Sequence, residues 1–258
     1  MIRPKADLNY MDDLADLLFA IASLDRLTLF TAIAKEKLRL TQLAEKLSAS
    51  TQETSRHLSR LQEAKIVERA SDGCFILTPF GKSLLVLLPS LRFLVEYKEY
   101  FLSHDLSNLP LEFVERMGEL ERCEFRYGIG EVLNHTAQVF REAKRHVWLC
   151  SDNVMDLNAL GGKEVGGDVL LRIIVPSSAI REVSSARTEL GPKAELRTVE
   201  VVNAGLALNE KRAGVTLQDS KGRIDFNSGF GSDDPKFQKW CSDLFMFHWN
   251  KAKNIQFR

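Results

Sequence analysis

The sequence predicts an α+β protein with two parts, a small helical part that ends in a β-hairpin and a larger part in which strands and helices alternate. Apolar residues recur at helical spacing through residues 12–35 and 80–102. Between these stretches lie a short helix, a polar-faced helix and two short strand candidates. Beyond residue 111, strand candidates are separated by helical stretches, a rhythm that is typical of an α/β sheet.

The composition is that of a globular protein with no overall charge. The 258 residues are 45% hydrophobic and include 35 Lys plus Arg and 35 Asp plus Glu, for a formal net charge of zero. This length accommodates one large domain or two modest ones. A neutral chain lacks the simplest indication of a nucleic-acid partner, so any such partner must be recognised through local charge and shape.

Cysteine spacing and the apolar runs exclude several classes of protein. Cys74, Cys123, Cys150 and Cys241 form no CxxC pair, so neither a disulfide framework nor a zinc ribbon is expected, and no metal or cofactor is predicted. Acidic residues directly follow the basic ones near the N-terminus, unlike a signal peptide. The apolar run at 84–88 is too short to span a bilayer. We therefore expect a soluble, cytoplasmic protein without a membrane partner.

The first part begins with one long or once-broken helix over about 12–35. Thr41 is the expected N-cap of the short helix TQLAEKL, and Ser48-Ala49 is expected to form a tight turn. Ser50 and Glu53 have the S-x-x-E spacing of a capping box, which predicts that the next helix starts at residue 50.

The helix after residue 50 is predicted to have a narrow apolar stripe and a broad polar face. Thr54, Leu58 and Leu61 fall on one side, and small hydroxyl side chains, a glutamine and two arginines fall elsewhere. The segments IVER and CFILT then read as strands joined at Asp72-Gly73, a strong hairpin signal. This order of elements predicts a winged helix-turn-helix, whose second helix of the turn pair would enter the DNA major groove.

Candidate DNA contacts follow from this prediction. Gln52 can pair with adenine, and Arg56 or Arg60 with guanine. Residues 1–88 carry 12 basic against 11 acidic residues, a net of +1, so non-specific affinity should be weak and salt-sensitive. The alternatives are a solvated helix, which would carry more Lys and Glu, and a winged helix used for protein contacts. The complete candidate set is Thr41, Ser50, Thr51, Gln52, Ser55, Arg56, Ser59, Arg60, Arg69 and Lys82.

The second part is predicted to be an α/β domain over 111–258, after a linking helix and linker at 89–110. A helix is expected over about 111–120, and Gly128-Ile-Gly130 opens another that runs to about 144. Its expected strands are CEFRY, HVWLCS, LLRIIV, AELRTVEVV, GLALN and AGVTLQD, with a helical stretch near 177–188 and an aromatic helix from Pro235. His248 lies in that last helix, where core or dimer packing is favoured over a ligand role.

Ligands of α/β sheets collect beyond the C-terminal ends of strands. This rule points to Ser151, Asp152, Asn153, Ser177 and Asn209 as candidate ligand-binding residues. Ordinary loop polarity is the alternative for each of them. Gly128-Ile-Gly130 opens a helix whose free N–H groups could hold an anion, but a plain turn is favoured. The GGKEVGG segment at 161–167 lacks regular phosphate-loop spacing and is read as a flexible hairpin or lid in preference to a binding loop.

The segments SLDRLTLF, TQLAEKL, STQETSRHLSRLQEAKIVER and FILTPFGKSL resemble archaeal winged-helix regulators. With HDLSNLP, LLRIIVP, ALNEKRAGVTLQD and LFMFHWNKAKNI, they resemble regulators that carry the methanogenesis-regulator effector domain. That domain is similar to the phospholipase-D-like sensing domain of TrmB-type sugar regulators. The resemblance covers nearly the whole chain, and it implies a dimeric transcription factor with a C-terminal sensing domain.

An active phospholipase-D-like enzyme needs the pattern H-x-K. None of the five histidines, His57, His104, His135, His146 and His248, is followed at that spacing by Lys, and the sequence has no H-E-x-x-H, Walker loop or G-x-S-x-G. We therefore expect a catalytically dead phospholipase-D-like fold and no enzyme.

Three functions remain as hypotheses. The favoured one is a homodimeric regulator that binds a pseudo-palindromic operator in double-stranded DNA and senses a small-molecule effector. Helices near 12–24, 80–102 and 235–252 are candidate dimer faces, with Phe93, Tyr97 and Trp240 as candidate anchors. The alternatives are a winged-helix adaptor with a passive dimerisation domain and a DNA-tethered phosphodiesterase-like enzyme.

Overall fold

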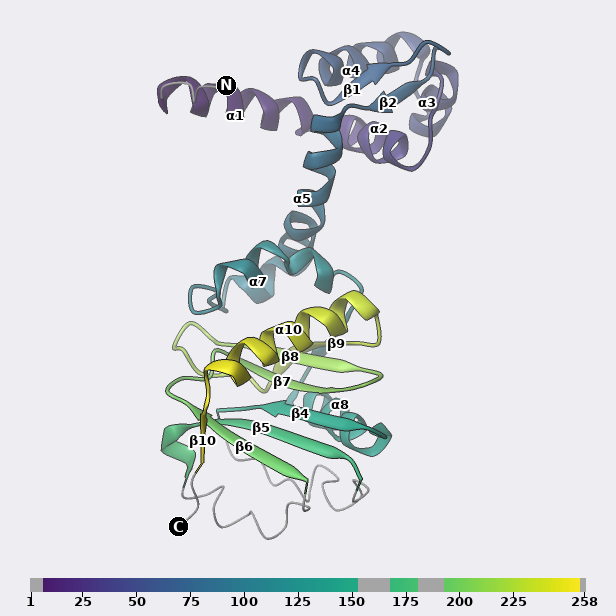
Figure 1. Cartoon of the computed structure of the whole chain (residues 1–258). Coiled ribbons are helices and arrows are strands. Elements are labelled where there is room, and N and C mark those ends of the chain that lie inside the picture. The colour runs from purple at the N-terminus through teal and green to yellow at the C-terminus, as the bar shows by residue number, and fades with distance from the viewer. Residues whose placement is uncertain (1–6, 153–167, 181–192, 256–258) are drawn as a thin grey trace. The chain divides into compact units, whose positions relative to one another are not determined.

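The computed structural model describes residues 7–152, 168–180 and 193–255 and divides into two compact units, Met1–Leu88 and Pro89–Arg258 (Figure 1). The first unit contains, in order, α1 Asp7–Ile21, α2 Leu24–Lys35, α3 Leu40–Leu47, α4 Thr51–Glu63, β1 Val67–Arg69, β2 Phe75–Leu77 and the start of α5 Pro79–Glu96. The strands β1 and β2 form an antiparallel hairpin, and Leu38 adds a bridge to Phe75. This order confirms the predicted winged helix-turn-helix.

The long N-terminal helix is broken once, between α1 and α2, and the two helices meet at 85°. Arg26 stabilises the corner because its Nε donates to the Ala20 carbonyl at 2.6 Å and its guanidinium also donates to the Phe19 carbonyl at 2.9 Å. These carbonyls belong to the last turn of α1, where no intrahelical donor reaches them. Of the two forms that the sequence allowed, the once-broken helix is the one observed.

The start of α3 differs from its prediction. Arg39, not Thr41, is the N-cap, and its backbone N–H donates to Gln42 Oε1 at 2.8 Å. Because the glutamine side chain reaches back to this N–H, the helix starts before Thr41, and the predicted capping role of Thr41 is wrong. Ser48, with φ of 54°, ends α3 in the left-handed region. Ser50 caps α4 as predicted, since its hydroxyl accepts from the Glu53 backbone at 3.2 Å.

The core of the first unit is built from one face of each helix and the inner face of the hairpin. Its fully or nearly fully buried members are Leu29, Phe30, Ile33, Leu38, Leu43, Leu58, Leu61, Ile66, Val67, Phe75 and Leu77. The backbone of α5 at Gly81 packs closely against the backbone that leads into the hairpin. A Cβ added to Gly81 would lie 2.1 Å from the Ile66 carbonyl oxygen. A residue without a side chain is therefore required at this position.

The second unit adds α6 Lys98–Phe101, α7 Leu111–Glu115, α8 Ile129–Glu142 and α10 Pro235–Lys251, with 3-10 helices at Met117–Leu120 and Ser177–Ala179. Its strands are β3 Glu124–Tyr127, β4 His146–Cys150, β5 Leu170–Pro176, β6 Ala194–Val199, β7 Ala204–Asn209, β8 Ala213–Leu217, β9 Ser228–Ser232 and β10 Lys253–Asn254. They form one sheet in the order β10-β6-β5-β4-β7-β8-β9-β3. Only the β4–β5 and β5–β6 pairs are parallel.

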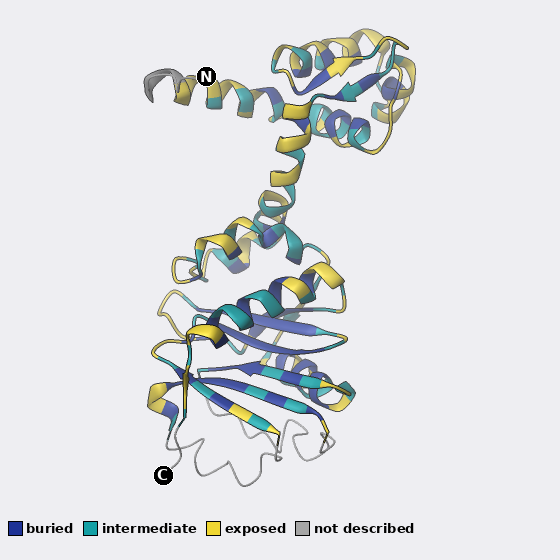
Figure 2. Cartoon of the chain, in the orientation of Figure 1, coloured by how far each residue is buried: buried dark blue, intermediate teal, exposed yellow. Residues whose placement is uncertain are grey.

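Helices cover both faces of this sheet, which confirms the predicted α/β domain. On one face, α8 packs Val139 and Phe140 against Val147, Leu149, Leu171 and Ile173. On the other, α10 packs Trp240, Leu244 and Phe245 against residues that include Leu206, Leu208 and Val215. Figure 2 shows the buried strands between the helices. The likeness to a phospholipase-D fold stays a prediction.

Residues 89–110, predicted as a linking helix and linker, belong to the second unit. Phe93, Tyr100 and Leu109 are at most 6% exposed and lie in its core. The segment SHDLSNLP is polar, but it is hydrogen-bonded to the β8–β9 region: the Asp105 N–H donates to the Gln218 carbonyl at 3.1 Å. Its turn-rich composition therefore marks a well-connected loop and not a domain boundary. The boundary between the two units lies earlier in the chain, between Leu88 and Pro89 in α5.

Two further features concern the cysteines and the apolar helices. All four cysteines are free, and burial raises the pKa of the Cys150 and Cys241 thiols. Among the described residues, no single helix is long and apolar enough to cross a membrane. The bent pair Tyr10–Ile21 and Leu24–Lys35 meets the criteria of length and composition only when taken together.

The contact at Gly81 generates a prediction for the stability of the first unit. Gly81→Ala would press a methyl carbon against the Ile66 carbonyl, and we expect a loss of about 1–3 kcal/mol in the free energy of unfolding. All three tryptophans lie in the second unit. Circular dichroism should therefore show an earlier transition while tryptophan fluorescence stays unchanged. The exposed Ser83→Ala is the control, and identical transitions for both variants would contradict the prediction.

Candidate nucleic-acid interface and ligand sites

The exposed side of α4 brings six of the predicted DNA contacts together. Thr54, Leu58 and Leu61 are at most 1% exposed and attach the helix to the core. The remaining surface of the helix presents Thr51, Gln52, Ser55, Arg56, Ser59 and Arg60, all exposed. Because one narrow stripe holds the helix, most of its circumference is left for contact with another molecule.

The side chains on this surface differ in how free they are. Ser59 donates to the Ser55 carbonyl at 3.0 Å, and Arg60 lies 3.5 Å from Glu63. The side chains of Gln52 and Arg56 have no hydrogen-bond or ion-pair partner in the described part of the chain. An amide and a guanidinium without partners are the groups that pair with two acceptor or donor atoms of a base edge.

A residue that the sequence reasoning missed helps to orient α4. His57 Nε2 lies 3.4 Å from Asp25 Oδ2, and its side chain is 21% exposed. The contact joins α4 to α2 at the flank of the apolar stripe. The signal in the sequence was its spacing, since His57 follows the buried Thr54 by three residues and so faces the same side of the helix.

The other predicted DNA contacts lie on neighbouring elements. Thr41 on α3, Arg69 on β1 and Lys82 on α5 are exposed. Arg69 Nε donates across the hairpin to the Gly73 carbonyl at 3.3 Å. At the hairpin turn the Cys74 backbone N–H donates to Asp72 Oδ1 at 3.0 Å, and this bond lowers the pKa of Asp72. The tip of the wing therefore carries an ionised carboxylate that opposes insertion between phosphates.

Three of the predicted ligand residues meet at one edge of the sheet. Ser151, Asp152 and Ser177 follow the C-terminal ends of the adjacent parallel strands β4 and β5. Asp152 Oδ2 accepts from the Ile224 backbone at 3.2 Å, and the Ser177 hydroxyl donates to the Val199 carbonyl at 3.2 Å. Ser151 is 2% exposed. Asn153 lies outside the described residues.

Asn209 is not part of this edge. Strand β7 is antiparallel to β4, and Asn209 pairs with Val147 near the start of β4. Its amide is also committed: Nδ2 donates to the Val139 carbonyl at 2.7 Å, and Oδ1 accepts from the backbones of Lys211 and Arg212. The C-terminal ends of two strands lie at the same end of a sheet only when the strands are parallel. Since β7 is antiparallel to β4, Asn209 lies at the opposite end from Ser151, where its side chain stabilises the β7–β8 turn.

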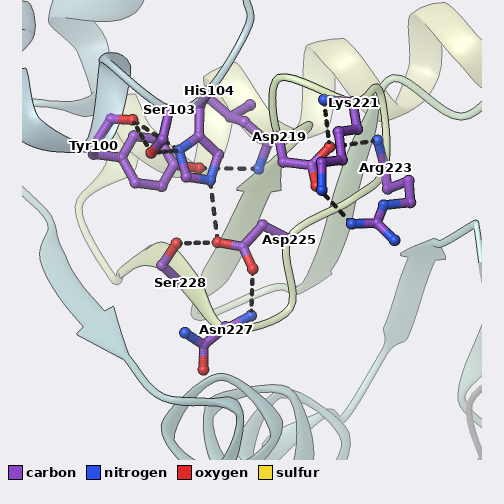
Figure 3. Close-up of polar contacts among 10 residues, drawn as sticks. Tyr100, Ser103, His104, Asp219, Lys221, Arg223, Asp225, Asn227 and Ser228 are labelled. Atoms are coloured by element: carbon purple, nitrogen blue, oxygen red, sulfur yellow. Dashed lines mark hydrogen bonds and ion pairs between the residues drawn. The ribbon is translucent and has the colours of Figure 1, made fainter.

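A polar cluster around His104 has residue types that occur in catalytic sites (Figure 3). His104 Nε2 lies 3.1 Å from Asp225 Oδ2, and Nδ1 lies 2.8 Å from the Tyr100 carbonyl. The ring stacks on Tyr100 with centroids 3.6 Å apart. The Ser228 hydroxyl also donates to Asp225, and the Asn227 backbone donates to its other oxygen at 2.9 Å.

The hydrogen bonds of this cluster do not activate a nucleophile. Ser103 Oγ lies 3.1 Å from His104 Nδ1, but it donates to the Tyr100 carbonyl. That carbonyl can only accept, so Nδ1 must keep its proton and cannot remove one from Ser103. The cluster instead fastens the segment after α6 to the β8–β9 connection, where Asp219 also accepts from the backbones of Lys221 and Arg223 (Figure 3).

The second unit contains a groove and a smaller cavity. A groove of about 740 Å³ runs next to the His104 cluster, lined by residues that include Tyr97, Phe125, Tyr127 and Asp225. A second cavity of about 350 Å³ lies between β3, β9 and α8 and includes Arg126 and His135. Within the described ranges, no group of three or more His, Cys, Asp or Glu side chains is placed to hold a metal ion.

No family model matches the chain, and no curated protein matches it. Among solved structures it is similar to TrmBL2, an archaeal chromatin protein, with 17% identity over 95% of this chain and 99% of that one and a TM-score of 0.43. NolR from Sinorhizobium fredii is 23% identical over 35% and 96% of the chains (TM-score 0.31), and NucT from Helicobacter pylori is 11% identical over 51% and 100% (TM-score 0.40). Because every one of these TM-scores is below 0.5, they support no statement about activity.

Two buried histidines make the second unit sensitive to acid. Burial lowers the pKa of His135 and of His248 to about 4, below the ordinary 6.5. The unfolded chain therefore binds more protons than the folded one between these values, so stability is full above about pH 6.5 and falls as the pH drops toward 4. Each histidine contributes about 3 kcal/mol at most to this loss.

We expect the urea midpoint followed by tryptophan fluorescence to decrease between pH 6.5 and 4.5, and His248→Gln to flatten this dependence. His57→Gln, in the first unit, is the control and should leave it unchanged. The same slope in His248→Gln and in the unchanged protein would show that His248 is not responsible.

Proposed function

We propose that the protein is a transcription regulator that binds specific sequences of double-stranded DNA through α4. The observation that supports this most directly is the pair Gln52 and Arg56, whose side chains are exposed and have no partner among the described residues, on a helix whose opposite stripe is buried. A helix that served only as a solvated surface would not need this excess of small hydroxyl side chains around two base-pairing groups.

In the proposed complex, α4 lies in the major groove and α3 lies across it. Small side chains near the start of α4, those of Ser50, Thr51 and Ser55, would allow its backbone to approach the groove closely. Gln52 would read adenine and Arg56 guanine, each through two hydrogen bonds. Thr41, Arg69 and Lys82 would contact the phosphate backbone and set the register of α4.

A homodimer is the second part of the proposal. A unit with a net charge of +1 has little non-specific affinity, and two copies on half-sites about 34–36 Å apart would supply what one copy lacks. Helix α1 offers the apolar surface for this contact: Tyr10, Met11, Leu18 and Phe19 are 51–69% exposed. A helix of 15 residues with so much apolar surface in water is marginally stable alone, so a partner would stabilise it.

The dimer contact cannot use two of the anchors that the sequence suggested. Phe93 and Trp240 are 0% exposed and belong to the core of the second unit. Tyr97 is half-buried, with its ring 5.0 Å from that of Phe93. The exposed apolar side chains of α1 therefore take the place of these anchors in the proposed dimer contact.

The second unit is proposed to be a sensor for a small molecule and not an enzyme. Two observations support this assignment. The pattern H-x-K is missing from the sequence, and the hydrogen bonds of His104 are arranged to hold a loop and not to activate Ser103. A cavity of about 350 Å³ in this unit has the size of a small-molecule site.

Base reading by Arg56 can be tested with DNA recovered by pulldown and sequencing with the purified protein. Arg56→Ala should weaken binding to the recovered site by about 1–3 kcal/mol and change binding to random DNA much less, because base contacts discriminate and phosphate contacts do not. Fluorescence anisotropy at fixed salt measures both affinities. Lys35→Ala removes the same charge from α2 and is the control. Equal losses on both DNAs would assign Arg56 to the phosphate backbone.

The proposed dimer can be tested by light scattering at micromolar concentration, which should give twice the mass of one chain. Leu18→Asp should shift the protein to monomer because it places a charge in the proposed apolar contact. Thr31→Asp, at an exposed position of α2, adds the same charge elsewhere and should remain dimeric. A monomer in the unchanged protein would refute this part of the proposal.

A further inference from the structure

The groove of about 740 Å³ in the second unit has an aromatic wall. Phe125 and Tyr127 lie two residues apart on β3, so their side chains share one face of the strand. The centroid of the Phe125 ring is 5.8 Å from that of Tyr97 and 5.7 Å from that of Tyr100. Four aromatic side chains from β3 and from the helical segment around α6 therefore line one groove.

Part of this wall is open to solvent. Tyr127 is 74% exposed and Phe125 is 41% exposed, and β3 is the edge strand of the sheet. The Tyr127 ring contacts no other aromatic ring among the described residues. The faces of an aromatic ring carry partial negative charge. A molecule that enters the groove can therefore reach an electron-rich surface that the fold itself leaves uncovered.

The charged residues of the groove are mostly acidic. Its lining includes the carboxylates of Glu96, Glu99 and Asp225, and its basic residues are Lys98 and His104. Acidic groups are therefore in excess even when His104 is counted as charged beside Asp225 (Figure 3). The exposed Glu99 carboxylate has no hydrogen-bond or ion-pair partner within the described ranges. The groove thus presents negative charge next to its aromatic wall.

The two glutamates of the groove lie three residues apart on a helical backbone. The backbone hydrogen bonds of Tyr97 and Phe101 continue the helical pattern from α5 into α6, so Glu96 and Glu99 face the same side. Carboxylates at this spacing repel each other. Glu96 is 4.0 Å from Arg92, whose side chain is 74% exposed, so this repulsion is only weakly compensated. A cation in the groove would reduce it further.

We propose that this groove binds a small organic cation of the alkylammonium class, whose charge is attracted by the aromatic wall and by Glu96 and Glu99. The alkyl groups of such an ion can lie against aromatic faces, which attract its positive charge. An anion would be repelled by the carboxylates. A metal ion would need several oxygen ligands, and the described residues place no group of three or more acidic, His or Cys side chains to supply them.

The groove has the volume of a small-molecule site. The inference rests on the proposed sensing role for its biological meaning, because it assigns a ligand class to the second unit. Binding of the cation itself requires neither DNA binding nor dimer formation, so the two proposals can fail separately.

The full chain labelled with 3-fluorotyrosine tests the inference without DNA. Its four tyrosines are Tyr10, Tyr97, Tyr100 and Tyr127, and variants with Phe at each position assign the ¹⁹F resonances. Choline is the probe, and 3,3-dimethyl-1-butanol is an uncharged molecule of the same shape. Choline should move the Tyr127 and Tyr97 resonances in a saturable manner, beyond the effect of the same concentration of sodium chloride. Tyr10, in the first unit, should not respond.

The uncharged alcohol should bind at least about threefold more weakly than choline, because it lacks the attraction to the ring faces and the carboxylates. Equal affinities would show that the groove selects apolar shape alone, and saturable binding of acetate would show the opposite charge preference. Either result would overturn the assigned ligand class. If choline causes no saturable change, the groove is not a site for this class of ligand.

Tyr127→Leu keeps an apolar side chain but removes the ring, and Glu99→Gln removes the carboxylate that lacks a partner. Each should weaken choline binding about threefold, followed through the Tyr97 resonance. Glu112→Gln removes an exposed carboxylate of α7 that does not line the groove, and this control should leave the affinity unchanged. Tryptophan fluorescence on heating checks that the variants are folded, as expected for substitutions at exposed positions.

Unchanged affinity in both Tyr127→Leu and Glu99→Gln would show that choline binds elsewhere and that the proposal is wrong. Choline binding by a chain that fails to bind DNA would refute the proposed regulator and leave the ligand class standing. DNA binding by a chain that does not bind choline would do the reverse.

Discussion

The burial of Thr54, Leu58 and Leu61 under α4 is the constraint on which the proposed function depends. These three side chains occupy one narrow stripe, and they fix which side of the helix faces the core. A rotation of the helix by one residue would bury Ser55, Ser59 and Gln62 in an apolar core without partners, at a cost of several kcal/mol. The same stripe therefore stabilises the unit and keeps Gln52 and Arg56 in solvent.

The first unit could be predicted closely because its signals are local. The apolar period, the Ser50 cap and the Asp72-Gly73 turn each act within a few residues, and the structure contains all three. The cap of α3 was misplaced because two residue types competed for the role. Thr41 has the better capping side chain, but the Gln42 amide reaches the Arg39 backbone from within the helix, and single-residue preferences do not include such a contact.

The second unit was less predictable because its decisive contacts join residues that are far apart in the sequence. Strand β9, SGFGS, has one large apolar residue, and its glycines are needed because α8 and Thr216 lie against them. The direction of β7 depends on its pairing with β4, which no local pattern reports, and this direction separates Asn209 from Ser151. The loop at 103–110 is likewise held by Gln218, more than 100 residues away.

Two histidines of this unit differ in how many of their hydrogen bonds are satisfied. His104 has an acceptor at each nitrogen, and Asp225 in turn accepts from Ser228 and Asn227, so nothing in that cluster requires another molecule. His135 has Nε2 bonded to the Ala213 carbonyl, whereas Nδ1 is buried and has no partner among the described residues. An apolar side chain in place of His135 would have removed this unmet bond at little cost. The number of partners at each nitrogen therefore distinguishes the two rings: His104 fastens a loop, whereas His135 keeps an unmet acceptor inside the core at a cost in stability.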